Sequence, residues 1–246
     1  MIPEVLVSGL KMKDLLSPYP LLFLVYAIDF ALMSSFFHHK NILRRHKDDF
    51  KATILYFIYF FGGFFIIPVL FIILFFDSPI DALKGLGLQF GNYKLGLILL
   101  LIGIPLTILI AFLSSKDPEL KEQYPFSKNA CHNPKRFILY EMSYLIFYYT
   151  AWEFTFRGVF LFGILSFVGG SSRGIVFAIL LQSILATVFH LGHPHLEIIG
   201  ALVGSIIYGL IAYHTMSILY PLFLHAFIGI LSDSFFYRYH HNAQQI

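Results

Sequence analysis

Seven long apolar runs constrain the fold of this chain more than any other feature. A helix needs about 20 mostly apolar residues to cross the ~30 Å hydrocarbon core of a bilayer. Only two residues separate the sixth run from the seventh, and the first and sixth are short. We therefore predict an all-α polytopic transmembrane bundle of about seven spanning helices, in which the last two are alternatively one bent helix. The runs are Leu21–Phe37, Ala52–Phe76, Leu95–Leu113, Met142–Val168, Gly174–Leu191, Ile198–Tyr213 and Met216–Phe236.

The composition calls for a solvent other than water around much of the chain. Hydrophobic residues make up 58% and charged residues 13% of the 246 positions, whereas ordinary soluble domains are roughly 25% charged. The mean hydropathy is +0.75. A globule of this length has no interior large enough for so much apolar surface, so the lipid bilayer is the predicted partner. The net charge of only +3 gives no reason to expect nucleic acid.

Two basic connectors predict the orientation of the chain. His38–Lys51 and Ser114–Arg136 each carry five lysines and arginines. Loops rich in these residues favour the cytoplasmic side, so we expect the N-terminus outside and the C-terminus inside a bacterial or archaeal cell membrane. We divide the chain into an N-terminal flank at 1–20, a single membrane domain at 21–237 and a C-terminal tail at 238–246.

An acid and a base lie four residues apart inside the fourth run. At this spacing Glu153 and Arg157 share one face of the predicted helix and are able to pair. A charged side chain at the centre of a membrane costs at least ~2.5–3.5 kcal/mol, and pairing lowers that cost. The pair is therefore either a structural ion pair or a carboxylate that Arg157 orients to polarise water or a substrate.

Two histidines in later runs are candidates to act with this carboxylate. His190 lies at the predicted inner end of the fifth run, and His225 lies within the seventh. One arrangement has the carboxylate take a proton from water while two imidazoles hold the water and the oxyanion. The other is a zinc ion held by Glu153, His190 and His225, because catalytic zinc sites use three protein ligands and a water.

Three further acids are candidates for supporting roles. Glu197 opens the sixth run, where an acid also suits the positive end of a helix dipole. Glu141 directly precedes the fourth run, and Asp233 follows His225 by eight residues in the seventh. That spacing is about 80° around the helix and ~12 Å along it, so these two side chains are able to line one cavity without touching. The chain has no His-Glu-x-x-His motif, which argues against the zinc geometry of soluble proteases.

The element Glu153-x-x-x-Arg157-Gly, followed by His190 near a helix end and His225 in the last helix, resembles the CPBP family. This family comprises CAAX-prenyl endopeptidases and bacteriocin-processing proteins and is also called Abi. The resemblance covers roughly 140–233. It implies an intramembrane endopeptidase in which these two charged residues and two histidines form the catalytic set. The implied substrate is a membrane-bound polypeptide, either prenylated or bacteriocin-like.

Two positions that bear on catalysis depart from the family's pattern. Trp152 stands where the family has a first glutamate, which is generally credited with activating water, and Gly229 replaces an asparagine or a similar residue. We therefore expect Glu153 itself to act as the base, with Glu197 or Glu141 as the alternatives. The resemblance leaves both a zinc-dependent and a metal-free glutamate mechanism open.

The leading hypothesis from the sequence is thus an intramembrane metallo- or glutamic endopeptidase. The alternative is a catalytically degenerate family member that binds a membrane partner or acts as an immunity-type protein, because Trp152 removes one acid. A transporter is a third interpretation, since ionisable residues inside membranes also mark ion paths. The absence of an inverted repeat in the sequence counts against it.

Overall fold

The computed structural model describes residues 18–243, and these residues contain helices and no strand. Residues 1–17 of the predicted N-terminal flank and 244–246 of the predicted tail lie outside the described residues. Segments η3, η5 and η6 are π-helical and η4 is a 3₁₀ helix. The elements are α1 (Tyr19–Ser35), α2 (His39–Arg45), α3 (Asp49–Phe61), η3 (Gly62–Ile66), α4 (Ile67–Phe75), α5 (Pro79–Gly85), α6 (Tyr93–Ser114), α7 (Pro118–Gln123), η4 (Lys128–His132), α8 (Pro134–Ser143), η5 (Tyr144–Tyr149), α9 (Thr150–Glu153), η6 (Phe154–Gly163), α10 (Ile164–Val168), α11 (Ser172–Val188), α12 (His195–Thr215) and α13 (Leu219–Ala243).

Each of the seven apolar runs coincides with one helical stretch, so the all-α polytopic bundle is confirmed. The number of spans is smaller than seven by length and composition. Within the described part of the chain, five helices are long and apolar enough to cross a membrane, and a sixth is added if the bent pair α1 and α2 counts as one span. The fifth run forms α11, which has only 17 residues and falls short of that length.

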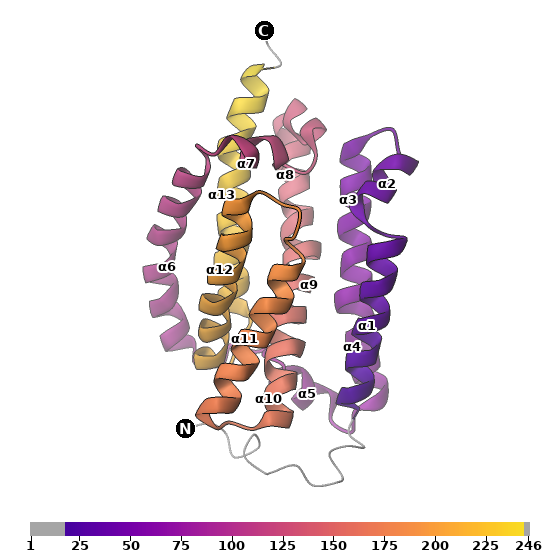
Figure 1. The fold of residues 1–246 in the computed structure, drawn as a ribbon, viewed down its shortest axis with the longest axis vertical. Coiled ribbons are helices and arrows are strands. Elements are labelled where there is room, and N and C mark those ends of the chain that lie inside the picture. The colour runs from indigo at the N-terminus through magenta and orange to yellow at the C-terminus, as the bar shows by residue number, and fades with distance from the viewer. Residues whose placement is uncertain (1–17, 244–246) are drawn as a thin grey trace.

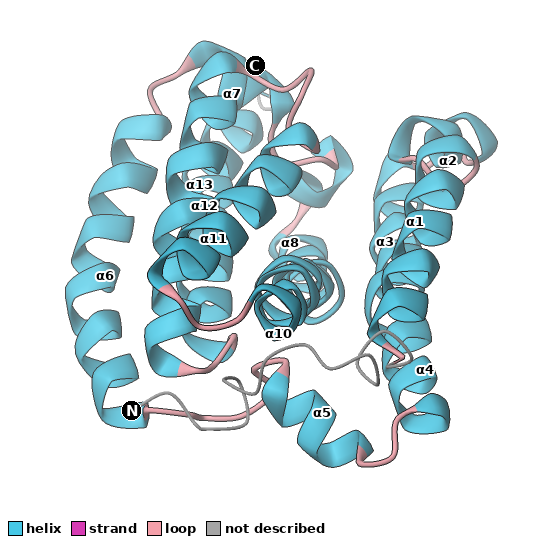
Figure 2. Cartoon of the chain, turned by 60° about the horizontal axis from the view of Figure 1, so that its bottom comes forward, coloured by secondary structure: helices cyan, strands magenta, loops and turns pink. Residues whose placement is uncertain are grey.

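The long helix formed by α8, η5, α9, η6 and α10 is the centre of the bundle (Figure 1). It is 72% buried across its most apolar window, compared with 17% for α6, which lies at one side of the bundle. Helices α11, α12 and α13 lie between this central helix and α6, while α1, α3 and α4 cover its other side (Figure 1). Figure 2 shows α5 lying across one end of the bundle. The central helix is therefore the element on which buried polar groups gather.

Hydrogen bonds to one buried backbone carbonyl hold α1 and η3 against the central helix. The carbonyl oxygen of Phe64 accepts hydrogen bonds from the Tyr26 hydroxyl at 3.0 Å and from the Thr155 hydroxyl at 3.3 Å. Phe64 lies in the π-helical segment η3, where the wider turn frees carbonyl groups from the α-helical pattern. Inside a membrane, side-chain hydroxyls are a means of satisfying such groups.

The short helix α11 sets the depth of the turn that follows it. Its 17 residues span about 26 Å, whereas the 35 residues of the central helix span about 52 Å at ~1.5 Å per residue. As a result α11 ends part-way along the bundle, beside α9 (Figure 1). The helix ends at Val188, two residues before His190. Pro194 then precedes α12 and breaks helical continuity.

A sharp corner separates α12 from α13, which are two helices and not one bent helix. Met216 at this corner has a positive φ of 54°. The loop before α6 binds the corner through Asn92 N, which donates to the Thr215 carbonyl at 2.7 Å, and through the Gly87 carbonyl, which accepts from Ile218 N at 3.0 Å. A Cβ at Gly91 would lie 1.9 Å from the Thr215 oxygen, so only glycine permits this close approach. One end of α6 is thereby fixed to the corner.

Candidate active site

Glu153 and His225 are hydrogen-bonded in the middle of the bundle. The Glu153 Oε1 atom lies 2.6 Å from Nδ1 of His225, and its Oε2 atom lies 3.2 Å from Nε of Arg157. Because a carboxylate only accepts, the proton of this bond is on Nδ1 of His225. The Glu153 side chain is fully buried and that of His225 is 21% exposed. The expected helical pair of Glu153 and Arg157 is therefore present, and it holds one imidazole.

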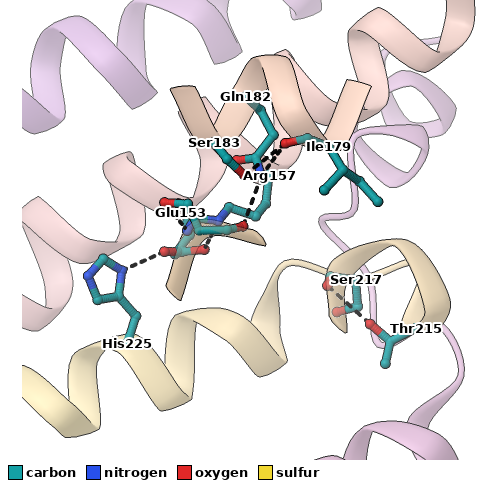
Figure 3. A network of polar contacts seen from close by, with 9 residues as sticks. Glu153, Arg157, Ile179, Gln182, Ser183, Thr215, Ser217 and His225 are labelled. Atoms are coloured by element: carbon teal, nitrogen blue, oxygen red, sulfur yellow. Dashed lines mark hydrogen bonds and ion pairs between the residues drawn. The ribbon is translucent and has the colours of Figure 1, made fainter. Parts of the chain in front are cut away.

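The Arg157 guanidinium continues this contact across two more helices. Its Nη2 donates to the Ser205 hydroxyl on α12 at 3.3 Å. The Gln182 amide on α11 donates to the Ser205 carbonyl at 2.9 Å and to the Ser183 hydroxyl at 2.7 Å (Figure 3). The guanidinium also lies 5.6 Å from the Tyr208 ring centroid, within the range of a cation–π contact. A polar network thus joins the central helix to α11, α12 and α13.

His190 lies in the turn after α11 and presents one free ring nitrogen. Its Nδ1 is 3.0 Å from the Ala186 carbonyl oxygen, which only accepts, so Nδ1 carries the proton. In the neutral ring Nε2 therefore carries a lone pair. Burial lowers the pKa of His190 to about 4, against a smaller upward effect of Glu197. His190 is consequently neutral at physiological pH.

Glu197 lies at the start of α12, close to this free nitrogen. Its Oε1 atom accepts from the Tyr124 hydroxyl at 2.6 Å and lies 2.8 Å from Nδ1 of His193. Its Oε2 atom is buried and has no hydrogen-bond partner among residues 18–243. The distance from Oε1 to Nε2 of His190 is 3.9 Å, a separation at which a bridging water is expected. This second carboxylate is 15% exposed, unlike Glu153.

Trp152 brings the two acid–histidine pairs into contact. Its ring centroid lies 5.2 Å from that of His190 and 6.3 Å from that of His225. A cavity of about 570 Å³ is lined by all three rings and by Glu197. Its remaining walls are mainly aliphatic residues of α6, α12 and α13. The arrangement offers a carboxylate, imidazoles and an apolar groove within one space.

Residues 135–231 match the family model described as type II CAAX prenyl endopeptidase Rce1-like. This stretch, about two fifths of the chain, is similar to the Rce1-like family. It includes Glu153, Arg157, His190 and His225, and it agrees with the region in which the sequence resemblance was found. No curated protein and no solved structure matches the chain. At the level of the family, the chain is an integral membrane protein with a CAAX-type intramembrane endopeptidase domain.

The predicted site residues lie in separate groups of contacts. Glu153 contacts His225, whereas His190 contacts Glu197. Asp233 lines the same cavity but accepts a hydrogen bond from Tyr140 at 3.2 Å.

Glu141 is buried on α8 and has no hydrogen-bond partner in the described part of the chain. It does not line the cavity of the Rce1-like domain. The predicted set is therefore only partly brought together.

The side chains of the Rce1-like domain do not fit the zinc site that the sequence suggested. Residues 18–238, whose side chains the structure describes, contain no group of three His, Cys, Asp or Glu side chains able to hold a metal ion. Both Glu153 oxygens are turned toward His225 and Arg157, and the Trp152 ring packs against both histidines. The set of Glu153, His190 and His225 therefore does not form a three-ligand site in this arrangement.

Sequence reasoning missed two partners of Glu197. Tyr124 precedes the matched stretch and lies 73 residues from Glu197 in the chain, so no helical spacing links them. His193, the second partner, lies in the turn before α12 and four residues before Glu197. The separation of His193 and Glu197 by four residues was the available signal, but Pro194 between them argued against one helical face.

Proposed function

We propose that this chain hydrolyses a peptide bond of a membrane-bound polypeptide, using a water held between His190 and Glu197. The observation that carries the proposal is the pairing of a free imidazole lone pair with a carboxylate 3.9 Å away at the wall of the cavity. A general base must lie within hydrogen-bond reach of the proton that it removes, directly or through one water. Both groups meet that condition for a single water.

Glu197 suits the role of base better than Glu153, to which the sequence hypothesis gave it. Glu153 is fully buried and already holds Arg157 and His225. To reach water it would have to leave a buried ion pair, and breaking such a pair costs about 3–5 kcal/mol. Neither carboxylate has a hydrogen bond on Oε2 among the described residues, but Oε2 of Glu153 faces the Arg157 guanidinium whereas that of Glu197 faces no cation. The Tyr124 hydroxyl donates to the other oxygen of Glu197.

The proposed reaction needs only the side chains at the cavity and one water. The water gives a proton to the Glu197 and His190 pair, and its oxygen bonds to the carbonyl carbon of the substrate. Negative charge then develops on the carbonyl oxygen, where a hydrogen-bond donor is needed to stabilise it. The carbon–nitrogen bond breaks as the nitrogen takes the proton. The products are a carboxylate and an amine.

The apolar walls of the cavity indicate the substrate class. Gly103 and Leu106 of α6, Ile207 of α12 and Leu224 of α13 all line this cavity. An apolar segment or a lipid chain gains about 25 cal/mol per Å² when such walls remove it from water. Prenylated or bacteriocin-like polypeptides, the substrates implied by the resemblance, both carry apolar parts of this kind.

The test is cleavage of a membrane-anchored fluorogenic peptide by the purified protein in lipid vesicles. We expect His190→Ala to lower kcat by at least ~100-fold, in the range of lost acid–base catalysis. His195→Ala is the matched control, because this histidine is exposed and is not among the cavity residues. A folded His190→Ala protein with undiminished activity contradicts the proposal.

A second candidate function is favoured by Trp152. The indole is 3% exposed and occupies the position at which the family has its first glutamate. It packs against both histidines, so the cavity would bind a membrane partner without cleaving it. Retention of the biological function after replacement of both His190 and His225 by Ala would support this binding role over hydrolysis.

A further inference from the structure

The hydroxyl of Tyr149 occupies the space of a missing side chain on α13. A Cβ added to Gly229 would lie 1.8 Å from the Tyr149 oxygen and 2.8 Å from Cζ of the ring. Real Cβ atoms do not come this close to another atom, so the phenol depends on glycine at position 229. The chain thus leaves room at this point for one hydroxyl group.

Tyr149 also packs against the imidazole that Glu153 holds. The ring centroids of Tyr149 and His225 are 4.9 Å apart and edge to face. Tyr149 and Glu153 are four residues apart on the central helix, and His225 and Gly229 are four residues apart on α13. Residues at this spacing share one helix face. The two faces meet, so the carboxylate and the phenol approach the same imidazole from the central helix.

Tyr149 lies at the wall of the proposed catalytic cavity. Tyr149, His225 and Gly229 all line it, together with His190 and Glu197. Tyr149 is only 4% exposed, which limits competition by bulk water for its hydrogen bonds. A phenol donates one O–H bond. Preorganised donors in a site of this kind are the groups that stabilise a developing oxyanion.

We propose that the Tyr149 hydroxyl donates a hydrogen bond to the carbonyl oxygen of the scissile peptide, beside His225. This role rests on the proposed hydrolysis and deepens it, because it assigns a hydrogen-bond donor to the oxyanion. The hydroxyl keeps its proton throughout, so no covalent bond of the tyrosine forms or breaks. Gly229 is then a positioning residue, because it leaves the space in which the hydroxyl stands.

The first test is Tyr149→Phe, assayed with the membrane-anchored peptide in lipid vesicles. Loss of one oxyanion donor lowers kcat by about 10²–10³-fold, and we expect KM to stay within about threefold. The control is Tyr26→Phe, which removes a fully buried hydroxyl bonded to the Phe64 carbonyl, away from the cavity. The control should lower thermal stability and leave kcat unchanged.

The second test uses Gly229→Ala alone and combined with Tyr149→Phe. The alanine methyl displaces the hydroxyl, so the single variant should lose both stability and kcat. In the double variant the closest contact relaxes from 1.8 Å to the 2.8 Å of Cζ, which is still tight, so only part of the stability should return. If the hydroxyl donates to the oxyanion, kcat of the double variant stays as low as that of Tyr149→Phe.

A phosphinic peptide, which carries a tetrahedral anion in place of the scissile carbonyl, gives an independent readout. Tyr149→Phe should weaken its binding by about the factor by which kcat falls, while binding of the substrate itself is unchanged. Unchanged kcat in Tyr149→Phe, or recovery of kcat in the double variant, overturns the role of Tyr149 and leaves hydrolysis standing. Absence of cleavage by the unaltered protein overturns both proposals.

Discussion

Two acid–histidine pairs lie on either side of one tryptophan, and they differ in their access to water. Glu153 is 0% exposed and its partner His225 is held at 2.6 Å. Glu197 is 15% exposed and stands 3.9 Å from Nε2 of His190. A glutamate and a histidine are thus directly hydrogen-bonded in the first pair, which we call the closed pair. They are too far apart for a direct hydrogen bond in the second, which we call the open pair. Burial and distance, more than residue identity, indicate which pair is free to activate water.

The difference follows from the partners of each acid. Arg157 neutralises Glu153 deep in the central helix and ties it to α11 and α12 through Ser205 and Gln182. Glu197, at the start of α12, contacts a phenol from the loop after α7 and an imidazole from the turn after α11. A buried carboxylate held beside a guanidinium is fixed in place. A carboxylate with no cation beside it is freer to take a proton from water.

A substitution of Glu197 is the most direct test of the difference between the two pairs. We expect Glu197→Gln to lower kcat by about 10²–10⁴-fold, since glutamine accepts no proton from water, and to leave the thermal midpoint nearly unchanged. The measurement is peptide cleavage in vesicles together with a thermal unfolding scan. A fully active Glu197→Gln protein, beside a folded and inactive Glu153→Gln protein, would return the role of base to Glu153.

The closed pair is tested by removing the positive charge of Arg157, which lies beside Glu153. Arg157→Met leaves Glu153 as an uncompensated buried charge, so we expect a loss of about 3–5 kcal/mol in the free energy of unfolding. The loss is measurable by denaturant titration in mixed micelles. Arg173→Met is the control, because Arg173 is exposed at the start of α11. Equal stability of the two variants would mean that the closed pair does not hold the bundle together.

A smaller effect is expected at the partner of the open acid. Tyr124→Phe removes the 2.6 Å hydrogen bond to Glu197, and hydrogen bonds to charged groups contribute about 1.5–3 kcal/mol. We expect kcat/KM to fall by roughly 10- to 150-fold, with the fold retained. A fall of less than about twofold would show that Tyr124 does not orient Glu197.

The smallest of the predicted effects is the change of kcat/KM with pH near neutrality. Because the pKa of His190 is lowered to about 4, we expect no acid limb near pH 6.5, and kcat/KM should fall only as the pH approaches about 4. The unfolded chain takes up the proton near pH 6.5, so stability should decrease as pH falls from 6.5 toward 4. The measurement is a pH–rate profile paired with unfolding at each pH. An acid limb at pH 6.5 that His190→Gln removes would contradict a buried neutral imidazole.

The sequence predicts the helices well because lipid imposes a simple rule on them. The apolar runs coincide with helices, and the separation of Glu153 from Arg157 predicts a contact found at 3.2 Å. Spacing within one helix is fixed by geometry, so such pairs are readable without a structure. The length of α11 shows where this reasoning stops, because its end at Val188 depends on the turn that follows.

Contacts between helices are what the sequence could not predict. Tyr124 and Glu197 are 73 residues apart, and Tyr149 and Gly229 meet only when the central helix packs on α13. The pairing of His225 with Glu153 was expected as part of one cluster, but nothing in the chain showed that Trp152 would face both histidines. These contacts depend on the rotation of each helix about its axis, which a hydropathy pattern constrains weakly when the helix is apolar on all sides.

The two ends of the outer helix α6 have different surroundings. Its first residues are bound to the corner between α12 and α13 through Asn92 and Gly91, whereas Ile110 and Ser114, toward its other end, line the cavity. The outer helix therefore closes one side of the cavity over most of its length, from Leu99 to Ser114, while its start is held at the corner.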